Sequence, residues 1–169
     1  MNYNRTRIVH PWGPVFDSES RVLILGTIPS PKSREAGFSY GHPQNIFWET
    51  LATVLGKQTP EYDTGARKMF VLENHIAIWD VLHSCEIDGA SDFSIRNPVP
   101  NKFASLLEKT KIEKIFTTGK KATELFERLC VDEAGMKPVY LPSTSPANRA
   151  MHKRPDFLSL WNEVAKALN

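Results

Sequence analysis

Residues 26–48 hold side chains that could bind a flat molecule with hydrogen-bonding edges. Phe38 and Tyr40 offer aromatic surface, and His42 and Asn45 follow with donors and acceptors. Glycines and prolines recur through the segment, and they allow a backbone to approach a ligand closely while holding the loop stiff. Aromatic faces beside polar side chains suit a planar heterocycle. We therefore predict that this segment contributes a binding site for such a group.

Basic side chains gather in stretches without acids, although the formal net charge is only +2. Residues 142–155 include Arg149, Lys153 and Arg154 but no Asp or Glu, and Lys120 lies in a second acid-free stretch. Such segregation can create one basic face on a nearly neutral protein, as binding to a phosphate backbone requires. The alternative is that the uneven distribution arose by chance.

The elements that must position these residues follow an alternating pattern. Short apolar runs bounded by turn or polar residues predict buried parallel strands at residues 22–25, 76–79, 115–117 and 139–141. Helical patterns occur at residues 47–55, 64–74, from 100 or 101 to 107, 120–129 and 157–168. Strands that alternate with helices indicate a parallel sheet covered on both faces. The predicted fold class is α/β, a three-layer α/β/α sandwich around a four-stranded parallel sheet.

Ligands of open parallel sheets bind beyond the carboxyl ends of the strands. In this chain those ends lead into loops that begin at Gly26, Asp80, Thr118 and Pro142. We therefore expect the functional residues to lie on these loops.

The length and composition are typical of one globular domain. Of the 169 residues, 41% are hydrophobic and 24% are charged, which excludes a disordered tail protein, a fibre and a coiled coil. No apolar run approaches the ~18 residues of a membrane span, and the N-terminus lacks the apolar core of a secretion signal. We expect a cytoplasmic monomer with a single domain over residues 1–169, in which residues 1–20 form an extended segment packed on the domain.

Metal and cofactor binding are not expected. The two cysteines, Cys85 and Cys130, are too few for a disulfide framework or a four-thiolate metal site. No spacing of His, Cys, Asp or Glu is typical of a metal centre, and residues 119–121 lack the upstream glycine and the Ser or Thr of a nucleotide-binding P-loop.

Three ordered motifs connect these loops to a known family. Residues 26–30 read GTIPS, residues 40–48 read YGHPQNIFW and residues 141–148 read LPSTSPAN. In this order they resemble the motifs of the uracil-DNA glycosylase superfamily, and most closely those of its hypoxanthine-DNA (deoxyinosine) glycosylase branch. The likeness covers nearly the whole chain and is strengthened by residues 82–86, 94–97 and 119–122. It implies a DNA repair enzyme that flips a deaminated base out of duplex DNA and hydrolyses its N-glycosidic bond.

The resemblance assigns the hydrolytic water to an unusual position. Excision leaves positive charge on the sugar and negative charge on the departing base, so the enzyme must orient a water and place donors around the base. Many superfamily members hold the water with Asp or Asn at the third position of the first motif, where this chain has Ile28. Likeness to the hypoxanthine branch implies that Asn45 supplies this amide. Because Asn45 directly precedes a helix, capping of that helix is the alternative.

A second group of residues is expected to bind the base. Tyr40 matches the aromatic residue on which relatives stack the flipped base. Asp80 occupies the position where relatives often have a base-reading Asn, and its carboxylate could accept the N1–H of hypoxanthine or the N3–H of uracil. The alternative is that Asp80 merely caps a turn. Phe38 and His42 complete the predicted base-binding set.

The third motif is expected to contact both the base and the DNA. Ser143 aligns with a His or Asn that contacts an oxygen of the departing base in relatives, so it is the second predicted catalytic residue. Relatives then have a bulky wedge, but this chain has Ala147, and Arg149 would fill the gap left by the flipped nucleotide. The predicted DNA contacts are Ser30, Lys32, Lys120, Ser145, Asn148, Arg149 and Lys153.

The sequence therefore predicts a monofunctional DNA glycosylase that removes hypoxanthine, with damaged double-stranded DNA as its partner. One alternative is a mismatch-specific uracil- or thymine-DNA glycosylase. The other is a catalytically inactive DNA-binding member of the superfamily, because Ile28 and Ser143 replace groups that usually perform the chemistry.

Overall fold

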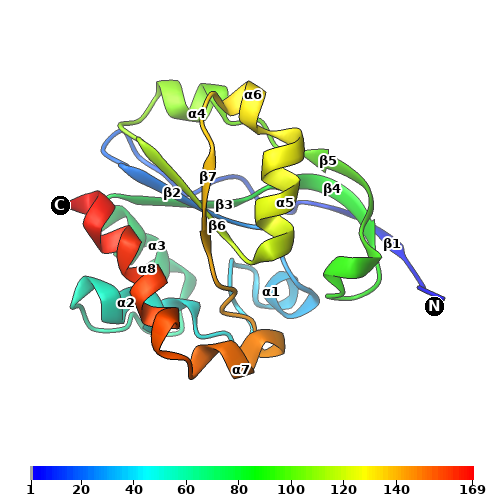
Figure 1. Ribbon diagram of the computed structural model, residues 1–169, viewed down its shortest axis with the longest axis horizontal. Coiled ribbons are helices and arrows are strands. Elements are labelled where there is room, and N and C mark those ends of the chain that lie inside the picture. The colour runs from blue at the N-terminus through cyan, green and yellow to red at the C-terminus, as the bar shows by residue number, and fades with distance from the viewer. Residues whose placement is uncertain (1) are drawn as a thin grey trace.

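Four parallel strands form the larger of two sheets in the computed structural model, which describes residues 2–169 (Figure 1). Their order is β3-β2-β6-β7, and all neighbouring pairs are parallel. The strands are β2 (Val22–Gly26), β3 (Ile76–Asp80), β6 (Lys114–Thr118) and β7 (Pro138–Leu141). The four predicted strands and their parallel arrangement are confirmed.

Helices cover both faces of this sheet, as the side chains along β2 require. Val22 and Ile24 pack into the core on one face. Leu23 and Leu25 pack into the core on the other, because successive side chains of a strand point to opposite faces. The first face is covered by α2 (Phe47–Leu55), α3 (Thr64–Glu73) and α8 (Pro155–Leu168). The second face is covered by α4 (Ala104–Glu108), α5 (Lys120–Leu129) and α6 (Val131–Ala134).

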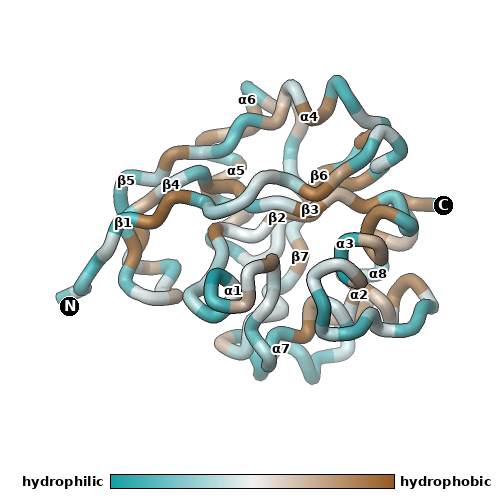
Figure 2. Tube along the Cα trace, turned by 180° about the vertical axis from the view of Figure 1, so that it is seen from behind, coloured by the Kyte–Doolittle hydropathy of each residue, from teal (hydrophilic) through white to brown (hydrophobic). Residues whose placement is uncertain are grey.

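This arrangement confirms the predicted three-layer α/β/α architecture. Hydrophobic colour gathers along β3 and β6 at the centre of Figure 2, whereas the outer turns are largely hydrophilic. Among the helices of residues 2–169, none combines the length and the apolar character needed to cross a membrane.

A second, antiparallel sheet is absent from the sequence prediction. It contains β1 (Thr6–Val9), β4 (Leu82–Ile87) and β5 (Arg96–Pro100) in the order β1-β4-β5. The predicted start of a helix at Pro100 or Asn101 is wrong, because Pro100 ends β5 and α4 begins at Ala104. Pro98 and Pro100 hold the residues before them in extended conformation, which favours an edge strand over a helix.

Short helical turns at the carboxyl end of the parallel sheet were likewise not anticipated from the pattern. They are α1 (Pro31–Ala36), η1 (Asp92–Ser94), η2 (Pro146–Asn148) and α7 (Arg149–His152). Two are fixed by serine caps: Ser30 accepts the backbone N–H of Ser33 at 3.1 Å, and Ser145 accepts that of Ala147 at 3.2 Å. In Figure 1, α7 lies at the bottom of the molecule and α1 lies above it.

The segment before β2 connects the two sheets. At the end of β1, the backbone N–H of His10 donates to the carbonyl of His83 at 2.7 Å. Further on, Val15 and Ile78 exchange two backbone hydrogen bonds of 3.0 Å each at the edge of β3. The chain between these anchors brings His10 to Asp80, the last residue of β3.

The strand register aligns the carboxyl ends of the parallel strands. Gly26 is paired with Asp80, and Thr118 is paired with Leu141. The chain continues from β2 to β3 on one side and reaches β6 on the other, so a topological switch point lies beside β2. A ligand site is expected at this point.

Candidate active site

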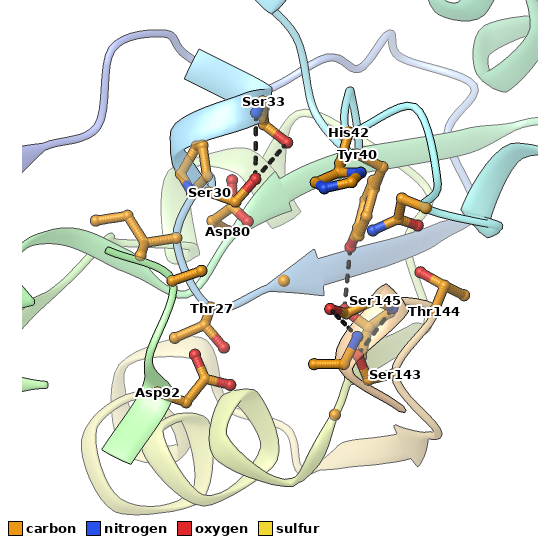
Figure 3. Close-up of a pocket in the computed structure, with 18 of the residues that line it drawn as sticks. Thr27, Ser30, Ser33, Tyr40, His42, Asp80, Asp92, Ser143, Thr144 and Ser145 are labelled. Atoms are coloured by element: carbon orange, nitrogen blue, oxygen red, sulfur yellow. Dashed lines mark hydrogen bonds between the residues drawn. The ribbon is translucent and has the colours of Figure 1, made fainter. Parts of the chain in front are cut away.

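A pocket of about 340 Å³ lies at the switch point (Figure 3). Loops after β2, β4, β6 and β7 form its wall, together with Asp80 at the end of β3. Its volume is within the range of small-molecule sites. The predicted site residues that line it are Ser30, Tyr40, His42, Asn45, Asp80, Ser143 and Ser145. Within residues 2–169, no three His, Cys, Asp or Glu side chains gather as a metal centre would need.

Tyr40 forms a fixed aromatic wall of the pocket. Its ring stacks on Phe47 with centroids 3.7 Å apart and an interplanar angle of 3°. Thr118 donates its hydroxyl proton to the carbonyl of Leu25 at 3.2 Å. The Tyr40 hydroxyl is therefore the donor in its 3.1 Å hydrogen bond to Thr118 Oγ1. Burial raises the pKa of Tyr40, and the nearby Asp80 carboxylate raises it further, so the hydroxyl stays protonated.

Phe38 does not line this pocket, so the structure does not bring it together with the other predicted base-binding residues. Its side chain is buried in the core beneath α2 and α3, and its ring stacks on Trp48 at 5.9 Å. An aromatic residue in a polar segment serves packing as well as binding, and the sequence does not reveal which way the ring points.

The Asp80 carboxylate is held by a residue that the sequence analysis did not select. His10 Nε2 lies 2.7 Å from Asp80 Oδ2, and the two side chains are 2% and 8% exposed. The other carboxylate oxygen lies above Gly26, where the methyl group of an alanine would come within 2.7 Å of Asp80 Oδ1. His10 and Asp80 are 70 residues apart, so no motif spacing could have paired them.

Asn45 both shapes the start of α2 and borders the pocket. Its Oδ1 accepts the backbone N–H of Phe47 at 2.9 Å, which identifies that atom as the amide oxygen. The amide nitrogen makes no hydrogen bond within residues 2–169 and is the group left for a ligand. His42 lies beside it, and its Nδ1 accepts the backbone N–H of Gln44 at 3.0 Å. A neutral His42 therefore carries its proton on Nε2.

The loop that carries Ser143 is held from behind by two side chains. The Ser143 carbonyl accepts hydrogen bonds from Asn148 Nδ2 at 2.9 Å and from His152 Nε2 at 3.0 Å. Ser143 Oγ accepts the backbone N–H of Ser145 at 3.2 Å, which leaves the hydroxyl proton available to the pocket. Asn148, predicted to contact DNA, uses its amide to support this loop.

The predicted basic contacts lie around the pocket rather than in it. Lys32 is exposed on α1 and lies 3.5 Å from Glu35. Arg149 is exposed at the start of α7 and donates to Gln44 Oε1 at 3.2 Å. Lys120 opens α5 and Lys153 follows α7, and both are exposed.

Comparisons with known proteins identify similar chains. The family model of the uracil DNA glycosylase superfamily matches residues 14–166. A hypoxanthine DNA glycosylase of Methanosarcina acetivorans is 32% identical over 151 residues, which cover 89% of this chain and 93% of that protein. A hypoxanthine DNA glycosylase of Methanosarcina barkeri is 31% identical over 154 residues, which cover 90% of this chain and 95% of that protein.

A solved structure is similar over the same extent. It is the solution NMR structure of a Methanosarcina acetivorans protein assigned as a uracil DNA glycosylase. It superposes with a TM-score of 0.76 and 30% identity, covering 93% of this chain and 96% of that one. The overall fold is therefore shared with this protein.

Gly26→Ala should destabilise the protein, because the added methyl group would meet Asp80 Oδ1 at 2.7 Å and the Tyr40 hydroxyl at 3.2 Å. We expect a loss of about 1–3 kcal/mol in the free energy of unfolding, measured by urea denaturation. Gly13→Ala is the control, because no atom lies within 4 Å of its added methyl group. Equal stability of the two variants would contradict this prediction, because it would show that Asp80 and Tyr40 move aside from the added methyl group at no cost.

Proposed function

Because the chain belongs to the uracil DNA glycosylase superfamily and is a DNA glycosylase, we propose that it removes hypoxanthine from duplex DNA as a monofunctional enzyme. The observation that carries this proposal is the pairing of an aromatic wall with a carboxylate acceptor in one pocket. Tyr40 stacks on Phe47 and borders the pocket, and Asp80 lines the same cavity. A flipped hypoxanthine would stack on Tyr40 and donate its N1–H to Asp80.

The remaining polar groups suit the departure of the base. As the C1′–N9 bond breaks, its electron pair leaves with the base and positive charge develops on the sugar. The Ser143 hydroxyl, with its proton free, donates to the departing base. Water then forms the new bond to C1′ and releases one proton, which balances the charge of the base.

Asn45 would orient this water through its amide N–H. The oxygen of the amide is occupied by Phe47, so Asn45 acts as a donor to the water oxygen rather than as a base. A donor is sufficient when the sugar already carries positive charge, because the water then needs positioning more than activation. Ile28 also lines the pocket and offers no competing hydrogen bond.

The basic rim would hold the flanking phosphates. Lys32, Lys120, Arg149 and Lys153 are exposed on elements that surround the pocket. Ser30 and Ser145 line the pocket itself. This distribution supports duplex DNA as the partner, with the flipped nucleotide entering the centre of the basic rim.

Uracil excision is the second candidate function. The same carboxylate of Asp80 that would accept the N1–H of hypoxanthine would accept the N3–H of uracil. The substrate base must therefore be established by comparing lesions.

A panel of otherwise identical duplexes tests the proposed function. They carry deoxyinosine, deoxyuridine, a G·T mispair or deoxyxanthosine at one site, and alkali-labile strand breaks are counted. We expect the deoxyinosine duplex to react fastest, with no strand break before alkali because the abasic site stays intact. Faster release of uracil or thymine would replace hypoxanthine as the substrate, and breaks without alkali would contradict monofunctional action.

Asn45 variants separate its two contacts. Asn45→Asp and Asn45→Ser keep an acceptor for the Phe47 N–H. The Asp carboxylate has no proton to donate, and the shorter Ser hydroxyl does not reach the position of the amide N–H. Both should excise about 100- to 1000-fold more slowly in single turnover, equivalent to ~2.7–4 kcal/mol, while melting near the wild-type temperature.

Asn45→Ala removes both contacts and provides the comparison. It should show the same loss of rate together with a loss of about 1 kcal/mol in stability. If Asn45→Asp and Asn45→Ser excise at the wild-type rate, Asn45 does not act as a donor to the water.

The basic rim predicts a strong dependence on salt. Affinity for lesion-free duplex should fall steeply between low and physiological salt, because bound Lys and Arg release counterions from DNA. Arg149→Ala with Lys153→Ala should reduce the slope of log affinity against log salt by roughly 2, and should weaken lesion and lesion-free DNA alike. Lys109→Ala, exposed at the opposite end of β6, is the control. An unchanged slope in the double variant would remove these residues from the DNA interface.

A further inference from the structure

We propose that His10 is a positioning residue that fixes Asp80 as a pure hydrogen-bond acceptor, so that the pocket admits bases with a protonated ring nitrogen and rejects adenine and cytosine. The inference rests on the proposed base-excision function. It adds to that function the means by which a deaminated base is told from its parent.

The direction of the hydrogen bond follows from the surroundings of the His10 ring. The backbone N–H of Trp12 donates to His10 Nδ1 at 3.3 Å, so Nδ1 presents a lone pair and carries no proton. The ring proton of His10 must then lie on Nε2, which faces Asp80 Oδ2 at 2.7 Å. His10 is therefore the donor and Asp80 the acceptor.

The second carboxylate oxygen remains available to a base. Asp80 Oδ1 lies above Gly26, a pocket-lining residue without a side chain, and accepts no hydrogen bond within residues 2–169. The Tyr40 hydroxyl lies on the same side but donates to Thr118, so it does not compete for Asp80. Within residues 2–169, His10 is the side chain that donates a hydrogen bond to the Asp80 carboxylate.

His10 is held firmly enough to impose this orientation. Its backbone N–H is bound to the carbonyl of His83, which continues the pairing of β1 with β4. Its ring meets Trp12 and Trp79 edge-on, with centroid distances of 5.5 and 6.2 Å. The Trp79 indole N–H in turn donates to the carbonyl of Trp12 at 3.3 Å. The His10 ring is therefore packed against two indole rings and faces Asp80 with Nε2.

Deamination changes the ring atom that this acceptor would meet. Adenine has a lone pair at N1 and cytosine at N3, whereas hypoxanthine and uracil have N–H groups at the same positions. An ionised carboxylate has only acceptor oxygens, so it repels those lone pairs and has no donor to present to them. An Asn side chain can rotate and present either its oxygen or its NH₂, so the His10–Asp80 pair makes the stricter test. Sites that must hydrogen-bond a buried group reject analogues lacking it by up to about 10⁴- to 10⁵-fold.

Two substitutions at His10 separate its donor from its volume. His10→Gln can keep an N–H near the position of Nε2, whereas His10→Phe keeps a ring without a donor. In single turnover on a deoxyinosine duplex, we expect His10→Phe to lose about 100-fold or more and His10→Gln to stay within about tenfold of wild type. Melting temperature and affinity for abasic-site DNA report whether each variant is folded. Equal losses in two folded variants would overturn the proposal.

A change at Asp80 gives a test that a structural role for His10 does not predict. In Asp80→Asn, the His10 N–H should bind the amide oxygen, so that the NH₂ group faces the N1–H of hypoxanthine. We expect the excision rate to fall to about 1% of the wild-type rate or less. Combining Asp80→Asn with His10→Gln should recover at least about tenfold, because the Gln amide can reverse and let the introduced oxygen face the base. A double variant no faster than Asp80→Asn, or an active Asp80→Asn, would contradict the inference.

The same experiment distinguishes failure of the inference from failure of the proposed function. If the wild-type protein releases uracil rather than hypoxanthine, the variants are compared on the uracil duplex, whose N3–H makes the same contact. Wild-type excision of either base with a fully active His10→Phe variant would leave the enzyme assigned and remove His10 from base selection.

Discussion

Gly26 lies beside Asp80 in the register of two parallel strands, and both residues line the pocket. Because Gly26 has no side chain, the polar atoms of neighbouring segments can approach its backbone. A methyl group there would lie 2.7 Å from Asp80 Oδ1, 3.2 Å from the Tyr40 hydroxyl and 3.7 Å from Thr118 Oγ1. The polar atoms of three segments thus converge over a single residue. Because the sheet is buried on both faces, its register cannot slip without exposing core side chains, so this convergence is as stable as the core.

Around Gly26, several polar groups of the pocket are held by hydrogen bonds to neighbouring residues. The Thr118 hydroxyl donates its proton to the carbonyl of Leu25, so its oxygen is left to accept the proton of the Tyr40 hydroxyl. The carbonyl of Thr144 accepts the backbone N–H of Ile46 at 3.2 Å. The last contact joins the loop of Asn45 to the loop of Ser143. Donors that are already oriented cost little reorganisation when charge develops on a departing base.

The sequence predicts the parallel sheet well because its strands are apolar on both faces, and it predicts pocket residues because loops at strand ends must meet. Asp80 and Ser143 come together for that reason alone. The sequence could not predict the position of His10, because it depends on the pairing of β1 with β4, and a single residue, Val81, separates β4 from the end of β3. The aromatic ring of Phe38 illustrates the complementary limit, because composition places it near the site but packing turns it into the core.

A carboxylate that recognises a base also opposes its departure. In the proposed complex the leaving base gains negative charge beside the Asp80 carboxylate, and two unit charges about 5 Å apart repel by roughly 3 kcal/mol at an effective dielectric constant near 20. The negative charge of the departing purine first develops at N9, across the ring system from N1. The repulsion is therefore smaller than it would be if the charged atom lay in contact with the carboxylate. Oriented donors of this kind contribute on the order of 2.7–4 kcal/mol each, so the Ser143 hydroxyl can offset the repulsion. Selection by an anion is therefore compatible with catalysis only where the acceptor and the donor lie at different edges of the base. The proposed roles meet this condition, since Asp80 ends β3 and Ser143 follows β7, the two outermost strands of the sheet.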